Sequence, residues 1–238
     1  YKILYSPIAR AIAVAEDFPT EGCQDILQAL TNYVPMSQQK KVRIPEDYTL
    51  LTILPNNICN FSCSYCYSAF GRNRSVLPLN KLYTAIEYFI SSKPEGFDKP
   101  LSISFMGGGE PMLSWGNVQA GICYAELLAA KRGAKLNISI ITNGSIINQE
   151  CIDFFLQHRL NISVSFEILP EVQNAQRKNF DLVWQNIKTL CTAGVPVQLN
   201  ATITPLNVSR MSEMLAKVIS DFPQIKSLMF EPATGEDI

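Results

Sequence analysis

The sequence predicts an α/β protein built on a parallel β-sheet, and three observations lead to this fold class. From Thr49 onward, strand-like and helix-like segments alternate about every 30 residues, which is the rhythm of βαβ units. The strand-like segments are nearly continuous apolar runs, as expected where helices cover a sheet. Of the 238 residues, 47% are apolar, which is ample for a large core. Six repeats with right-handed crossovers fit either an open doubly wound sheet or a partial barrel.

The first part of the chain, residues 1–45, is predicted to be a small accessory element. Two apolar runs within residues 1–15 predict a β-hairpin. Apolar residues at helical spacing predict a helix over 21–33, and the polar stretch 37–43 predicts a linker. We therefore expect a second, larger domain over residues 46–238.

The larger domain carries six strand signals and five helix signals. The predicted strands are 49–55, 101–106, 136–142, 161–166, 195–204 and 225–232. The predicted helices are 80–91, 115–132, 149–158, 181–193 and 209–222, where apolar residues recur at spacings of three and four. Gly194 follows the fourth of these helices as a C-cap signal. In either architecture a ligand binds at the carboxyl ends of the strands.

Composition excludes several classes of function. The 20 basic and 21 acidic residues leave a net charge of −1, which argues against nucleic acid as the main partner. No apolar run approaches the roughly 18 residues of a membrane span. Seven irregularly spaced cysteines do not form a secreted disulfide framework, so we expect a reduced, cytoplasmic protein. Because the chain starts at Tyr1 and stops just after a predicted strand, we expect a fragment of a longer protein.

Three cysteines follow the first of the six strands. Cys59, Cys63 and Cys66 have the spacing C-x3-C-x2-C, and thiolates this close converge on a metal more readily than they pair with each other. Three soft ligands without a nearby histidine select an iron–sulfur cluster or zinc. Structural zinc needs a fourth ligand, and the next cysteine, Cys123, has no spacing partner. Zinc and a loop with merely structural cysteines remain the alternatives. The other cysteines lie on predicted helices and are expected to be small core residues, namely Cys23, Cys123, Cys151 and Cys191.

The cysteine motif resembles that of the radical S-adenosylmethionine (SAM) enzymes, and the resemblance covers about residues 49–231. It follows the first strand of a βα array and has an aromatic residue before its third cysteine. The segment 106–111, MGGGEP, matches the family's GGEP element at the end of the second strand. The resemblance implies a partial (β/α)6, TIM-like barrel. It also implies that the three cysteines hold a [4Fe–4S] cluster, whose remaining iron binds the methionine moiety of SAM.

The resemblance further implies a set of SAM contacts at the strand ends. The candidates are Tyr65, Tyr67, Gly108, Gly109, Glu110, Thr142, Asn143, Ser165, Glu167, Arg177 and Leu199, with Asn200 beside Leu199 as a further candidate for the adenine. Glycines let the backbone approach a ligand closely, and a dinucleotide fingerprint is excluded because the required later glycine is absent. Tyr65 and Tyr67 are expected beside the adenine, and Arg177 is expected to face the SAM carboxylate, as a planar guanidinium suits that task.

Several of these candidates have simpler explanations. Glu110 is either a contact for the SAM amino group, directly or through a neighbour, or a solvated turn carboxylate. Asn143 is followed by glycine, which is also a common turn signal. Arg177 is alternatively a surface residue of an entering helix. Glu167 and Ile168 stand where many relatives have an acid–glycine pair near the ribose, so the chain departs from the family pattern there.

The implied function is reductive cleavage of SAM. One electron from the cluster breaks the C5′–S bond, and the resulting 5′-deoxyadenosyl radical abstracts a hydrogen atom from the substrate. The sequence is most similar to the branch that modifies peptides and proteins, which carries a cysteine-rich SPASM or twitch domain and includes ribosomal peptide maturases and sulfatase-maturing enzymes. The expected partners are a peptide or protein substrate and an external flavodoxin- or ferredoxin-like reductant. The alternatives are a radical SAM enzyme for a small metabolite or tRNA, and a non-enzymatic iron–sulfur or zinc-binding module.

Overall fold

The computed structural model describes residues 2–6, 11–15 and 48–233. The chain divides into two compact units, residues 1–43 and 44–238.

The first unit contains the predicted hairpin. Strand β1 (Lys2–Ser6) pairs antiparallel with β2 (Ala11–Ala15), with Lys2 opposite Ala15 and Ser6 opposite Ala11. The predicted helix over 21–33, the linker and Cys23 lie outside the described residues.

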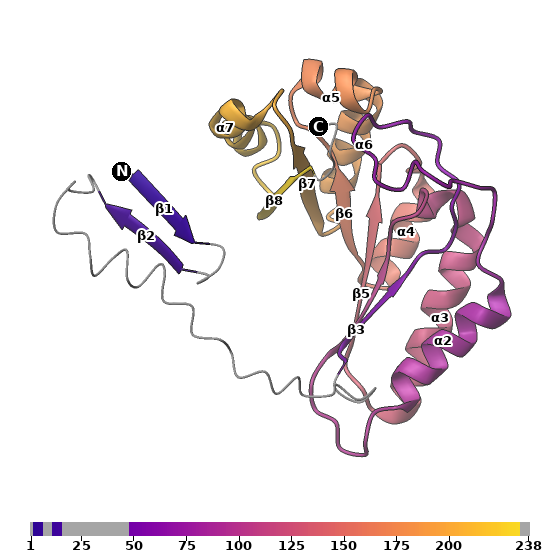
Figure 1. Cartoon of the computed structure of the whole chain (residues 1–238). Helices are drawn as coiled ribbons and strands as arrows, with labels where there is room; N and C mark the ends of the chain where they lie inside the picture. The colour runs from indigo at the N-terminus through magenta and orange to yellow at the C-terminus, as the bar shows by residue number, and fades with distance from the viewer. Residues whose placement is uncertain (1, 7–10, 16–47, 234–238) are drawn as a thin grey trace. The chain divides into compact units, whose positions relative to one another are not determined.

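The second unit is built on one six-stranded parallel sheet, as predicted (Figure 1). Its strands are β3 (Leu50–Ile53), β4 (Leu101–Phe105), β5 (Leu136–Thr142), β6 (Asn161–Ser165), β7 (Val197–Ile203) and β8 (Ser227–Pro232). The strands lie side by side in their order along the chain, and β3 and β8 are the two edges. A doubly wound sheet reverses its order at a switch point. The uninterrupted order therefore excludes that alternative and is the order of a partial (β/α)6 barrel.

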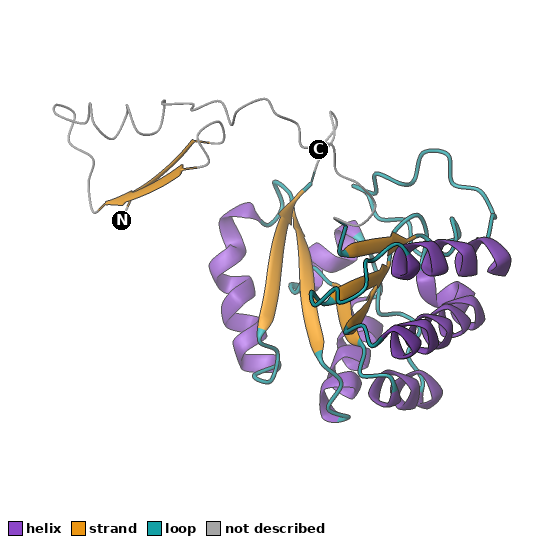
Figure 2. Ribbon diagram, turned by 90° about the horizontal axis from the view of Figure 1, so that it is seen from below, coloured by secondary structure: helices purple, strands orange, loops and turns teal. Residues whose placement is uncertain are grey.

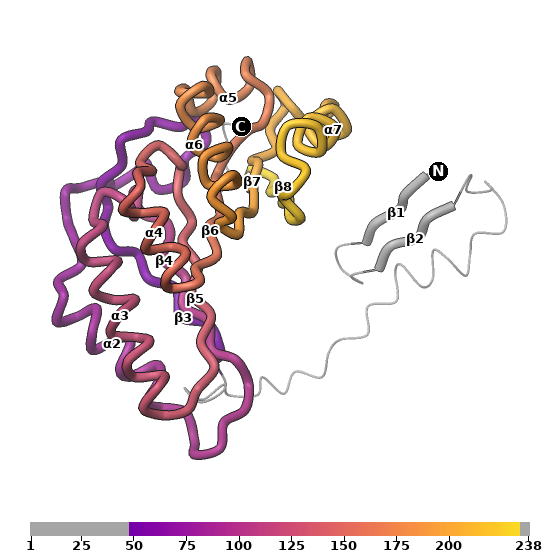
Figure 3. Tube along the Cα trace, turned by 180° about the vertical axis from the view of Figure 1, so that it is seen from behind, coloured from indigo at the N-terminus to yellow at the C-terminus, as the bar shows by residue number. Residues whose placement is uncertain are grey.

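Helices cover the outer face of this sheet, because every right-handed crossover in an uninterrupted order returns on the same side. They are α2 (Leu79–Ser91), α3 (Trp115–Arg132), α4 (Gln149–Gln157), α5 (Pro170–Gln176), α6 (Phe180–Thr192) and α7 (Met211–Asp221), with 3₁₀ turns η2 (Pro111–Ser114) and η3 (Val208–Arg210). Figure 2 shows the helices outside the curved sheet, and Figure 3 shows α2, α3 and α4 following one another along one side of it. The sequence pattern missed α5 and both 3₁₀ turns. Within residues 2–6, 11–15 and 48–233, no helix has both the length and the apolarity that crossing a membrane requires.

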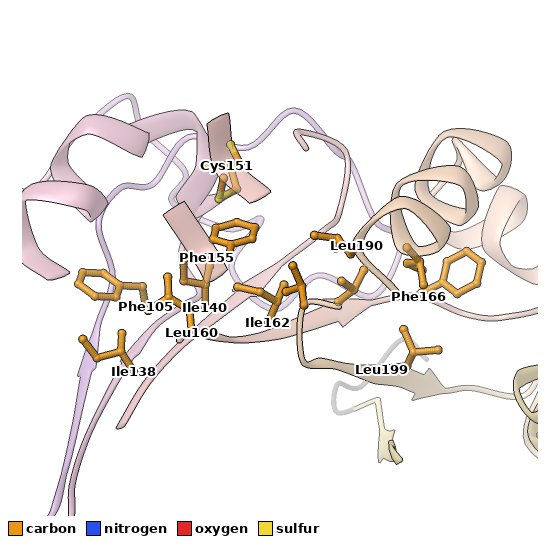
Figure 4. Close-up of a cluster of buried hydrophobic side chains, with 14 of the residues drawn as sticks. Phe105, Ile138, Ile140, Cys151, Phe155, Leu160, Ile162, Phe166, Leu190 and Leu199 are labelled. Carbon is orange, nitrogen blue, oxygen red and sulfur yellow. The ribbon is translucent and has the colours of Figure 1, made fainter. Parts of the chain in front are cut away.

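The hydrophobic core fills the space between the sheet and the helices (Figure 4). Every second strand residue points into it, so that Phe105, Ile140, Ile162 and Leu199 are fully buried there. Cys151 lies in this core, as Figure 4 shows, and Cys191 is also buried, as expected for small core residues. Cys123 corrects that expectation, because it lies on an exposed position of α3.

The inner face of the sheet carries many polar side chains. Complete (β/α)8 barrels fill this space with bulky branched side chains. Here Ser139, Ser163, Gln198 and Asn200 point inward and, together with apolar residues such as Ile141 and Met229, line a cavity of about 620 Å³. The interior of the partial barrel is therefore a chamber rather than a packed core.

Candidate functional site

A second cavity, of about 380 Å³, lies at the carboxyl ends of the strands. Residues at the end of each of the six strands, or in the loop that follows it, contribute to its lining. All the predicted site residues except Glu167 and Leu199 line it. The structure thus brings the cysteine motif, the GGGEP segment and Arg177 to one place.

The three cysteines of the motif lie in the long loop 54–78 between β3 and α2, which we call the cluster loop. Their thiols are free, and burial raises the pKa of the Cys63 thiol while the nearby Arg177 guanidinium opposes this shift. Among the described residues, no group of three or more His, Cys, Asp and Glu is arranged to hold a single metal ion. Zinc would require all ligands within about 2.3 Å of one point, whereas the ligands of a four-iron cube bind different irons and stand further apart. Three free thiols that line one cavity are the donor set of a [4Fe–4S] cluster with one open iron.

The GGGEP segment packs directly against the start of the cluster loop. The Glu110 amide donates to the Ile58 carbonyl at 2.7 Å, and the Gly109 amide donates to the Asn56 carbonyl at 3.0 Å. The Asn56 side chain donates in return to the Glu110 carbonyl at 2.9 Å. A Cβ atom on Gly109 would stand 2.0 Å from the Ile58 carbonyl oxygen, so only glycine permits this approach. Gly109 is thus needed for contact between two protein segments, and not only for contact with a ligand.

The Glu110 carboxylate ties the end of β4 to the end of β5. Its Oε1 accepts from the Thr142 hydroxyl at 2.6 Å and from the Met112 amide at 3.1 Å, and its Oε2 accepts from the Asn143 amide at 2.7 Å. Burial raises the pKa of this carboxyl, and the three bonds oppose that shift. A carboxylate offers about four acceptor positions, so one position on Oε2 remains. Glu110 is therefore a buried carboxylate that holds two strand ends together by hydrogen bonds, and not a solvated turn residue.

Asn143 joins the cluster loop to the end of β5. Its side-chain amide donates to Asn60 Oδ1 at 2.8 Å, and Asn60 donates to the Ser145 hydroxyl at 2.9 Å. Asn60 directly follows Cys59, so these bonds fix the loop beside the first cysteine. The Asn143–Gly144 pair forms a turn and also holds the loop.

A buried network of Tyr65, Glu167 and Arg177 joins the cluster loop to the end of β6. The Tyr65 hydroxyl donates to Glu167 Oε1 and accepts from Arg177 Nη1 at 2.8 Å. Glu167 Oε2 accepts from the Thr202 amide at 2.9 Å, and Arg177 Nη1 lies 3.9 Å from Glu167 Oε1. Burial raises the pKa of the Glu167 carboxyl, and the Tyr65 bond and the Arg177 charge oppose this shift. Arg177 is a buried cation at the cavity wall, not a surface residue.

Two predicted contacts lie elsewhere. Glu167 is fully buried and does not line the cavity, so the structure places it behind Tyr65 and Arg177. Leu199 faces the helices and belongs to the hydrophobic core, which corrects the expectation that it contacts a ligand. Its neighbour Asn200 lines the cavity, because alternate strand residues face opposite sides.

Sequence reasoning missed several polar residues of this cavity. They include Ser68, Arg72, Thr202 and Glu231. Thr202 lies two residues after Asn200, so the alternation along β7 was a usable signal. For Arg72 the sequence contained no signal of this kind.

Comparison with known proteins gives one family. The model of the Radical SAM superfamily matches residues 53–218. Among curated proteins, the radical SAM cyclopropyl synthase TigE of Paramaledivibacter caminithermalis is 23% identical over 63% of this chain and 34% of its own length. The serine-type anaerobic sulfatase-maturating enzyme of Klebsiella aerogenes is 27% identical over 60% of this chain and 35% of its own length. The sporulation killing factor maturation protein SkfB of Bacillus subtilis is 23% identical over 82% of this chain and 43% of its own length.

Solved structures share the fold. Native anSMEcpe with bound AdoMet and the Kp18Cys peptide superposes with a TM-score of 0.69 at 18% identity, covering 78% of this chain and 51% of that one. SuiB of Streptococcus suis bound to S-adenosylmethionine gives 0.63 at 16% identity, covering 79% of this chain and 41% of that one. The chain therefore spans about a third to a half of the length of these proteins. The family model covers most of the sheet and the whole cysteine motif, and the chain belongs to the radical SAM superfamily.

Proposed function

We propose that this protein uses SAM and a [4Fe–4S] cluster held by Cys59, Cys63 and Cys66 to modify a peptide or protein. The observation that carries the proposal is the convergence of three thiols, the GGGEP segment and a buried arginine on one cavity. Membership of the family implies both cofactors, and relatives that mature peptides or sulfatases support the substrate class. When bound, the cluster supplies the electron that cleaves SAM. An external one-electron reductant, flavodoxin- or ferredoxin-like, is part of the proposal.

The chain's own polar groups suit the ends of a SAM molecule. Arg177 is a buried cation whose Nε has no acceptor among the described residues, and we assign it to the SAM carboxylate. The remaining acceptor position on Glu110 Oε2 suits the SAM ammonium group. Asn200 and Thr202 of β7 also line the cavity and are assigned to the nucleoside.

We assign the substrate to the chamber on the inner face of the sheet, which polar and apolar side chains line together. The chamber and the thiol-lined cavity share Ile141, Asn200 and Glu231 in their linings, so a substrate there adjoins the cofactors. Its hydroxyl and amide side chains suit the backbone groups of an extended peptide. Residues 46–238 are proposed as the catalytic domain, with residues 1–45 as an accessory element.

The cofactor assignment is tested on protein reconstituted with iron and sulfide without oxygen. We expect bound iron and sulfide in equal amounts, and 5′-deoxyadenosine after addition of SAM and dithionite. The Cys63→Ala variant should lose the cluster and the product, while Cys123→Ala, an exposed cysteine away from the site, should retain both. Zinc binding without SAM cleavage by the wild type would overturn the assignment.

The substrate class is tested by the fate of the abstracted hydrogen. Peptides and small metabolites are prepared as separate fractions from cells grown in D₂O, and each is incubated with enzyme, SAM and reductant. Deuterium in 5′-deoxyadenosine from the peptide fraction alone supports a peptide substrate. Deuterium transfer from the metabolite fraction alone would instead assign the enzyme to a small molecule.

A further inference from the structure

One arginine of the cluster loop contacts a cysteine thiol directly. Arg72 lies six residues after Cys66, is half-buried and lines the thiol-lined cavity. Its Nη2 donates to Cys66 Sγ at 2.9 Å, and its Nη1 donates to the Phe61 carbonyl at 3.0 Å. A guanidinium presents its donors in a rigid fork, so one side chain spans both acceptors.

The positive charge of Arg72 is not neutralised nearby. Among the described residues no carboxylate forms an ion pair with it, and its buried Nε has no hydrogen-bond partner there. The other basic group near the thiols, Arg177, is engaged with Tyr65 and Glu167. Arg72 is thus a cation that donates a hydrogen bond directly to a cysteine sulfur, and no carboxylate of the described residues pairs with it.

We infer that Arg72 is a positioning residue that raises the reduction potential of the cluster through its bond to Cys66. This inference rests on the proposed function, because it requires a cluster on the three thiols. Reduction adds one negative charge to the cluster, so a nearby cation and a donor to a ligand sulfur stabilise the reduced form more than the oxidised form. Hydrogen bonds to ligand sulfurs are among the levers by which proteins set such potentials. The cluster must be reduced before it can cleave SAM, so Arg72 makes that reduction easier.

Arg72 also stabilises the cluster loop through its bond to the Phe61 carbonyl, so its effect on the potential must be distinguished from a purely structural role. Three variants distinguish the two roles. Arg72→Gln keeps a donor and removes the charge, whereas Arg72→Lys keeps the charge and loses the fork. Arg74→Gln removes the same charge from an exposed position two residues further along the loop and serves as the control.

The experiment is an anaerobic redox titration of the reconstituted proteins without SAM, followed by electron paramagnetic resonance of the reduced cluster, with iron content measured in parallel. We expect Arg72→Gln to shift the midpoint potential to a more negative value, Arg72→Lys to shift it less, and Arg74→Gln to leave it unchanged. A wild type that holds no cluster would refute the proposed function itself. Equal potentials in cluster-loaded wild type and Arg72→Gln would overturn only this inference. Loss of the cluster in both Arg72 variants would also overturn it, because Arg72 would then be needed only for the shape of the loop.

Discussion

Replacing Gly109 with alanine should separate the GGGEP segment from the cluster loop. The added Cβ would stand 2.0 Å from the Ile58 carbonyl oxygen and 2.3 Å from Asn56 Oδ1. Non-bonded atoms of this kind do not approach within about 3 Å, so one segment must retreat by roughly 1 Å. Two backbone hydrogen bonds join the segments, from the Glu110 amide to the Ile58 carbonyl at 2.7 Å and from the Gly109 amide to the Asn56 carbonyl at 3.0 Å. Such a movement breaks both.

The cost follows from these contacts. Two lost hydrogen bonds at about 1 kcal/mol each, with overpacking strain of about 1–3 kcal/mol, reduce the free energy of unfolding by roughly 3–5 kcal/mol. For a domain of this size each kcal/mol lowers the melting temperature by about 2–4 °C, so we expect a fall of roughly 6–20 °C.

The assay is thermal unfolding followed by circular dichroism at 222 nm, with Gly116→Ala as the matched control. Gly116 lies in the first turn of α3, and a Cβ there meets nothing within 4 Å. Alanine at Gly116 should leave stability unchanged or raise it by about 0.5–1 kcal/mol, because glycine is unfavourable in helices. A Gly109→Ala protein that melts within 2 °C of the wild type would refute the argument from close approach.

The remaining predictions concern single side chains. Thr142→Val removes a donor to the buried Glu110 carboxylate and should cost about 1.5–3 kcal/mol in urea unfolding; an unchanged midpoint would mean that the carboxylate is satisfied otherwise. Leu199→Ala should cost about 2–5 kcal/mol, whereas Asn200→Ala should leave stability nearly unchanged and weaken SAM binding in equilibrium dialysis; the reverse pattern would restore Leu199 as the ligand contact. Tyr65→Phe should weaken SAM binding about tenfold because Arg177 loses its hydroxyl partner, and unchanged affinity would show that Arg177 holds its position without it.

The strands and the longer helices were predictable because their signals are local. Apolar periodicity within about ten residues identified all six strands of the sheet, and the parallel order followed from the alternation. Helix α5 was missed because it has only seven residues and buries the polar Gln173 and Gln176. Pro170 at its first turn was the available signal, since proline is favoured there.

The site was predictable as a collection of residues but not as a network. Motif spacing found the cysteines and the GGGEP segment, and the three cysteines and residues 107–110 line the cavity. Leu199 was misplaced although the alternation of Gln198, Leu199 and Asn200 indicates which side chain faces the helices. The bond between Tyr65 and Glu167 joins residues 102 positions apart, and such pairing follows only from the assembled sheet. Residue patterns within a short segment contain no information about such a long-range pairing.

The side-chain hydrogen bonds of the cluster loop follow the order of the strands. Asn56 bonds to the segment after β4, Asn60 to the end of β5, and Tyr65 to the end of β6. The loop therefore crosses three successive strand ends in sequence, with Asn60 adjoining Cys59 and Tyr65 adjoining Cys66. Because these partners belong to the sheet, the fold itself sets the course of the loop that carries the thiols. It follows that a substitution at one strand end displaces the three thiols through the loop, even where the altered side chain contacts none of them.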